Sequence, residues 1–250
     1  MVRRVLLAVA IVILTAGCGG SDEATTTDST STGPAALTAP VRVYWLRDGK
    51  VWPAARDAET PGIAGATAAQ LLEGPTEQEE SELGFATAIP KEAETLQVSI
   101  DDGVAQIELD AKLSSEALAQ LVYTLTQFPT VESVEIDAEV YTRSDFEDLT
   151  PAILVESPLP FEDVTSPLRV TGTANTFEAN FQYELTDTDG LIIAEDFVTA
   201  TSGTGTRGTF EFTVPFTIKF DGVGSLVVFE PSAKDGSRTN LVEIPIRMTQ

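Results

Sequence analysis

The residue with the most distinctive chemistry in this chain is Cys18, its only cysteine. A thiol becomes a nucleophile and a metal ligand once it loses its proton. Cys18 follows a leader in which Arg3 and Arg4 precede an apolar run over residues 5–16. At about 1.5 Å per residue, a helix of that length spans roughly 18 Å, well short of the ~30 Å core of a bilayer. The run therefore predicts the apolar region of a signal peptide rather than a permanent membrane span.

Small residues lead into this cysteine. The segment Thr15-Ala16-Gly17-Cys18 resembles the lipobox of bacterial lipoproteins, although that pattern prefers Leu where Thr15 stands. The resemblance implies that the Cys18 thiol is joined to a diacylglycerol and that a signal peptidase cuts between Gly17 and Cys18, which removes residues 1–17. A lone cysteine in an exported chain has no disulfide partner, so an assigned chemical fate is the economical interpretation. The alternatives are a buried free thiol or an ordinary cleavage site.

Two aspartates have the spacing of metal ligands. Asp187 and Asp189 are followed by Gly190, which invites a calcium interpretation. A calcium-binding EF-hand loop needs an oxygen ligand two residues before Asp187, and Leu185 stands there. Alternating sequence on both sides predicts a hairpin turn instead. We therefore expect a turn, with calcium binding as the alternative, and no metal site or cofactor is predicted.

Composition excludes several kinds of chemistry. The chain has 39 Asp plus Glu, 15 Lys plus Arg and no His, which gives a net charge of −24. Without His, neither a Ser-His-Asp triad nor imidazole acid–base catalysis is available. The negative charge argues against a nucleic-acid partner, because a phosphate backbone needs clustered basic residues. The acids crowd most closely at Glu77, Glu79, Glu80 and Glu82, where a solvated surface is expected. We predict no catalytic residue.

Composition also divides the chain into segments. Residues 18–40 are rich in Ser, Thr, Gly and Pro and hold one bulky apolar residue, Leu37, so they predict a disordered tether behind the lipidated cysteine. Residues 41–141 alternate between helix and strand patterns, residues 142–151 form a linker, and residues 152–250 show strand patterns only.

The segment 41–141 predicts an α+β domain. Strand patterns cover residues 41–46, 96–100, 105–109 and 134–140, and helices are predicted over 63–73 and between a cap at Ser114 or Ser115 and Pro129. Asp101-Asp102-Gly103 predicts a hairpin turn between the second and third strands. The order β-α-β-β-α-β indicates helices packed on one face of a single sheet.

Two strings in this segment resemble the GerMN domain of sporulation and germination lipoproteins. They are Leu71-Leu72-Glu73-Gly74-Pro75-Thr76 and Gln120-Leu121-Val122-Tyr123-Thr124-Leu125-Thr126-Gln127-Phe128-Pro129. One departure is that Ala138-Glu139-Val140 stands where the family commonly has a glycine after the last strand. The resemblance implies a protein-interaction role and offers no catalytic residues. By position alone, Thr124, Thr126 and Gln127 predict hydrogen bonds at a domain edge, with a partner-binding surface as the alternative.

The segment 152–250 predicts an antiparallel β-sandwich. Residues 177–185 alternate apolar and polar without exception, and further strands are expected at 153–155, 168–173, 191–199, 209–216, 225–230 and 241–248. The strings Ser166-Pro167-Leu168-Arg169-Val170-Thr171-Gly172-Thr173-Ala174 and Ser232-Ala233-Lys234-Asp235-Gly236-Ser237 resemble the immunoglobulin-like domain of bacterial spore-germination proteins. That family often follows a GerMN domain in exported lipoproteins.

These observations predict a non-enzymatic binding or scaffold module of the bacterial cell envelope. Cys18 would anchor it in the membrane by its lipid, on the extracytoplasmic face. Its expected partner is an envelope protein or a cell-wall polymer. The alternatives are a cell-wall glycosidase that works through Asp and Glu, and a regulator of a membrane sensor kinase.

Overall fold

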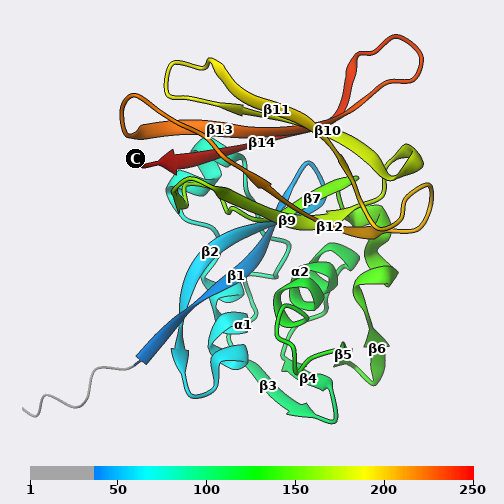
Figure 1. The fold of residues 1–250 in the computed structure, drawn as a ribbon. Coiled ribbons are helices and arrows are strands. Elements are labelled where there is room, and N and C mark those ends of the chain that lie inside the picture. The colour runs from blue at the N-terminus through cyan, green and yellow to red at the C-terminus, as the bar shows by residue number, and fades with distance from the viewer. Residues whose placement is uncertain (1–36) are drawn as a thin grey trace, which may run out of the picture. The chain divides into compact units, whose positions relative to one another are not determined.

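The computed structural model describes residues 37–250. The predicted signal peptide 1–17, its cleavage site at Gly17 and Cys18, and most of the predicted tether 18–40 lie outside the described residues. The fold class is confirmed: an α+β part precedes an immunoglobulin-like β-sandwich (Figure 1). Within residues 37–250, no helix is long and apolar enough to cross a membrane.

The chain opens with a long hairpin. Strand β1 (Leu37–Arg47) pairs antiparallel with β2 (Lys50–Thr60) in a separate two-stranded sheet. The first residues of β1 fall inside the stretch expected to be tether, because Leu37 pairs with Thr60 at the open end of the hairpin. The sequence did not predict β2, since Pro53 and its neighbouring alanines are poor strand formers.

The predicted helices and the β3–β4 hairpin are confirmed. Helix α1 (Ile63–Glu73) is followed by a five-residue π-helix, η1 (Glu79–Leu83). Strands β3 (Leu96–Asp101) and β4 (Val104–Leu109) form the expected hairpin, and helix α2 (Ser115–Leu125) begins after an N-cap in which the Ser114 side chain accepts a hydrogen bond from the Ala117 N–H.

The expected strand over 134–140 is wrong. It divides into β5 (Ser133–Ile136) and β6 (Glu139–Tyr141), because Asp137 and Ala138 form a turn with φ values of 54° and 63°. The resulting four-stranded sheet has the order β3-β4-β5-β6, with only β4 and β5 parallel. The helices therefore do not cover one face of a single sheet, since α1 and α2 contact both the β1–β2 hairpin and strands of this second sheet (Figure 1).

The sandwich has a five-stranded and a three-stranded sheet. Their orders are β11-β10-β13-β14-β8 and β12-β9-β7. The strands are β7 (Ile153–Ser157), β8 (Asp163–Val164), β9 (Leu168–Ala174), β10 (Asn180–Thr186), β11 (Ile192–Thr199), β12 (Gly208–Val214), β13 (Gly222–Pro231) and β14 (Arg238–Met248). Only the two-residue β8 had no sequence signal.

The start predicted for β10 is wrong. Phe177–Ala179 form a short 3-10 helix, η3, in which Glu178 and Ala179 have positive φ values and the Phe177 side chain is exposed. The buried face of β10 then begins at Phe181.

The two parts share buried residues. Strand β7 places Ile153 and Val155 in the core of the sandwich, while Leu154, which points the other way, is fully buried in the core of the α+β part. The predicted linker 142–151 is also ordered, because the 3-10 helix η2 (Arg143–Leu149) buries Phe146 in the α+β core.

Candidate functional site

Polar residues of α2 and of the turn that follows it line up on one side. Gln120 and Thr124 of α2 and Gln127, two residues past its end, are spaced i, i+4 and i+7, a spacing that places side chains on the same side. That side lies along the edge of β1 that does not pair with β2.

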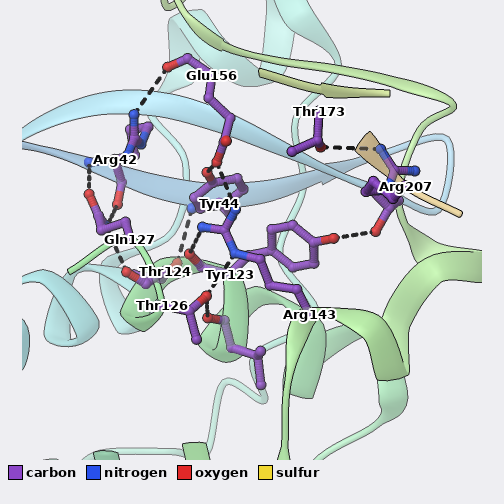
Figure 2. A network of polar contacts seen from close by, with 12 residues as sticks. Arg42, Tyr44, Tyr123, Thr124, Thr126, Gln127, Arg143, Glu156, Thr173 and Arg207 are labelled. Carbon is purple, nitrogen blue, oxygen red and sulfur yellow. Dashed lines mark hydrogen bonds and ion pairs between the residues drawn. The ribbon is translucent and has the colours of Figure 1, made fainter. Parts of the chain in front are cut away.

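These side chains bind the backbone of β1 as a neighbouring strand would (Figure 2). The Gln127 amide accepts a hydrogen bond from the Arg42 N–H at 2.8 Å and donates one to the Arg42 carbonyl at 2.5 Å. Thr124 accepts from the Tyr44 N–H at 3.1 Å, and Gln120 donates to the Tyr44 carbonyl at 3.0 Å. Thr124 and Gln127 thus form hydrogen bonds, as predicted, but they hold the edge of a strand within the α+β part and not an edge of the domain.

A second group of polar residues lies where the two parts of the chain meet. Arg143, on η2, donates to the Glu156 carboxylate of β7 at 2.9 Å and to the Thr126 hydroxyl at 2.7 Å. The Tyr44 hydroxyl donates to the same Glu156 oxygen. The Arg143 guanidinium also lies 4.6 Å from the centre of the Tyr123 ring, within cation–π range. β1 and η2 thus meet β7 at one half-buried carboxylate, and α2 contacts the same Arg143 (Figure 2).

The surroundings of Glu156 fix the charge of its carboxylate. Burial opposes ionisation of Glu156, but the positive charge of Arg143 and the hydrogen bond from Tyr44 outweigh it, so the pKa of Glu156 lies below its ordinary value. Burial and the nearby Glu156 charge raise the pKa of the Tyr44 hydroxyl far above its ordinary value. Tyr44 therefore stays protonated as a donor, and Glu156 stays ionised as an acceptor, at neutral pH.

A bidentate ion pair joins the same two parts nearby. Arg207, just before β12, donates to both carboxylate oxygens of Glu147 at 2.9 Å and to the Pro151 carbonyl at 2.9 Å. Asn175 donates to the same carboxylate at 2.8 Å. The hydrogen bond from Arg207 is the main cause that lowers the pKa of Glu147. We call the place where the two parts meet, around Glu156 and Glu147, the junction. Both of its carboxylates are therefore ionised.

The acidic stretch at residues 77–82 differs from the prediction at one position. Glu79 is buried rather than solvated, because Arg56 donates to its two oxygens at 2.7 and 2.6 Å and the Thr76 N–H donates at 2.8 Å. Burial opposes ionisation, but the hydrogen bond from Arg56 and the other donors lower the pKa of Glu79. Glu77, Glu80 and Glu82 are exposed as expected.

The aspartates of the calcium alternative lie in a turn between β10 and β11. One Asp187 carboxylate oxygen accepts hydrogen bonds from the backbone N–H groups of Asp189 at 3.0 Å and Leu191 at 2.9 Å. Among residues 37–250, no three His, Cys, Asp or Glu side chains are grouped as metal ligands would be.

No pattern in the sequence marks Arg143, Glu147, Glu156 or Arg207 as functional residues. Each lies in a segment without strong periodicity or at a strand end, and the partners are between 13 and 60 residues apart. The only available signal was the presence of charged residues around the ordered segment 142–151.

Family comparisons agree with this two-part structure. Residues 42–139 match the model of a family described as sporulation and spore germination, and residues 152–237 match that of the immunoglobulin-like domain of bacterial spore germination. Each of these two segments therefore matches a domain of the sporulation and germination type.

One similar solved structure is the tandem GerMN domains of the sporulation protein GerM from Bacillus subtilis, 23% identical, with a TM-score of 0.34. The match covers 43% of this chain and 41% of that chain, so this chain spans less than half of its length. No curated protein matches the sequence.

Proposed function

We propose that this protein is a lipid-anchored binding module of the bacterial cell envelope, held at the membrane by Cys18 and without catalytic turnover. The lipobox-like segment supports the anchor, and the germination-type domains support a place among envelope proteins. The partner would be an envelope protein or a cell-wall polymer.

The state of three carboxylates paired with arginines is the observation that carries the non-enzymatic part of the proposal. A glycosidase that works through two carboxylates needs one of them protonated near neutral pH, and therefore a raised pKa. In this protein Glu79, Glu147 and Glu156 each accept hydrogen bonds from an arginine, and each has a lowered pKa. These groups are suited to joining elements rather than to donating protons.

Two experiments test the proposal. Incubation of the purified protein with peptidoglycan should release no soluble fragments, and release that is lost in Glu147→Gln or Glu156→Gln would overturn the non-enzymatic role. In living cells, labelled fatty acid should appear on the wild-type protein and not on Cys18→Ala. Label on that variant would overturn the assignment of the anchor.

A further inference from the structure

Arg42 is the one arginine at the junction that lacks a carboxylate partner. Its Nη1 has a single long hydrogen bond, 3.4 Å, to the Glu156 carbonyl, and its Nε is buried with no hydrogen-bond partner. Within the described part of the chain, five other arginines form an ion pair with a glutamate: Arg56, Arg143, Arg169, Arg207 and Arg238. Buried donors without an acceptor are costly. The Arg42 guanidinium therefore has donors that no carboxylate of residues 37–250 pairs with.

The backbone holds Arg42 in place. Its N–H and carbonyl are both bound by the Gln127 side chain, so the strand position of Arg42 does not depend on its guanidinium. A group fixed in this way can bind a ligand without first paying the entropy of ordering its backbone.

Arg42 lines a depression of about 540 Å³ beside the three-stranded sheet β12-β9-β7. That volume lies in the range of ~300–1,000 Å³ that is typical of small-molecule sites. Threonines form much of its wall: Thr171, Thr173, Thr199, Thr201 and Thr209. They share a face because Thr171 and Thr173 alternate along β9, and Thr173 pairs directly with Thr209 of β12.

The hydroxyls differ in how far they are already used. Thr171 makes no side-chain hydrogen bond among residues 37–250, and Thr201 and Thr209 contact each other at 3.3 Å. Thr173 accepts from Arg207, and Thr199 donates to Asn180. A threonine hydroxyl both donates and accepts, which is the pattern that sugar hydroxyls require.

The charges of the depression favour an anion. Glu211 and Glu156 also line it, but Arg169 pairs with the first at 2.8 Å and Arg143 with the second at 2.9 Å. Arg42 forms no ion pair with either carboxylate, although its charge helps to lower the pKa of Glu156. A guanidinium binds carboxylate or phosphate through two parallel hydrogen bonds.

We propose that this depression binds a saccharide that carries a carboxylate or a phosphate, with the anion on Arg42 and sugar hydroxyls on Thr171 and the neighbouring threonines. The inference rests on the proposed binding function and deepens it, because it names the chemical class of the ligand. It does not depend on the lipid anchor, so the fatty-acid experiment and the binding experiment below can fail separately.

The test uses the full chain, purified in detergent, and three sugars with one ring type: glucose, glucuronate and glucose 6-phosphate. Ligand-observed NMR titration measures each affinity. We expect at least one of the two anions to bind about tenfold more tightly than glucose, and the anion that does so identifies the ligand group. Equal affinity for all three sugars, or no binding by any, would overturn the inference.

Two variants locate the binding. Arg42→Gln should reduce anion affinity to the level of glucose while leaving the thermal midpoint within a few degrees of wild type. The double variant Arg169→Gln/Glu211→Gln is the control, because it removes a paired arginine together with its carboxylate from the same depression, and it should change affinity less than threefold. Thr171→Val keeps the charge and should weaken binding of all three sugars. Unchanged anion binding by folded Arg42→Gln would refute the site.

Discussion

The junction carboxylate Glu156 offers a direct test of how the two parts of the chain are joined. In Glu156→Gln the shape of the side chain is kept, but Arg143 loses its counter-ion while the guanidinium remains largely buried. Removal of one partner of a fully buried pair costs about 3–5 kcal/mol. The Arg143 and Glu156 side chains are 27% and 14% exposed, so solvent lowers the expected loss to about 2–3 kcal/mol of unfolding free energy.

Urea unfolding followed by tryptophan fluorescence measures this loss. Trp52 is a suitable reporter because it packs against both hydrophobic cores. The midpoint should fall by about 1 M urea, as expected from a slope of roughly 2–3 kcal/mol/M for a protein of this size. Glu211→Gln is the control, since it removes the same charge from an ion pair whose side chains are 62% and 59% exposed, and it should leave the midpoint unchanged. Equal midpoints for the two variants would refute the structural role of Glu156.

The difference in unfolding free energy between wild type and Glu156→Gln should also depend on pH, with a defined sign. Folding lowers the pKa of Glu156, so its carboxylate stabilises the fold fully above the pKa of the unfolded chain, about 4.3, and that stabilisation is lost as pH falls through the lower folded value. The difference in unfolding free energy between wild type and Glu156→Gln should therefore be constant near neutral pH and narrow below pH of about 4. A difference that grows on acidification would contradict the assignment.

Two further substitutions test local features. Gln120→Leu leaves the Tyr44 carbonyl and the Ala88 N–H without their buried partner, so urea unfolding should show a loss of about 2–4 kcal/mol of unfolding free energy. The control Gln106→Leu changes an exposed glutamine and should cause no such loss. Equal losses in the two variants would contradict the edge-binding role of Gln120. Ala138→Gly relieves a residue with a φ of 63° and should raise the thermal midpoint, with a gain of about 1 kcal/mol, while Ala138→Val should lower it. A loss of stability on Ala138→Gly would show that the turn does not adopt this conformation.

The parts of the fold that follow short-range patterns could be predicted from the sequence. The i, i+3, i+4 spacing of α2, its Ser114 cap and the Asp102-Gly103 turn each depend on neighbouring residues only. Most sandwich strands were predictable for the same reason, because alternation over a few residues defines a strand with one buried face.

The elements that the sequence predicted wrongly or not at all depend on more than local pattern. Strand β2 is held by its pairing with β1 and not by the strand propensity of its own residues. The turn after β5 has Ala138 in a left-handed conformation, where a glycine would have marked the turn in the sequence. Phe177 continued an alternating pattern that the backbone of Glu178 and Ala179 interrupts. In each case a tertiary contact or a backbone conformation overrides the local pattern.

The junction could not be predicted at all. Tyr44 and Glu156 are 112 residues apart, and Arg207 and Glu147 are 60 apart, so no local spacing connects them. The string around Gln120 and Gln127 was visible, but its role depends on the unpaired edge of β1 lying beside α2.

The most direct test of the central claim is the intact mass of the protein extracted from its native membrane. The account predicts a polypeptide that begins at Cys18 and carries the added mass of a diacylglyceryl group, with residues 1–17 absent. An unmodified chain that retains residues 1–17 and is recovered from the cytosol would contradict it.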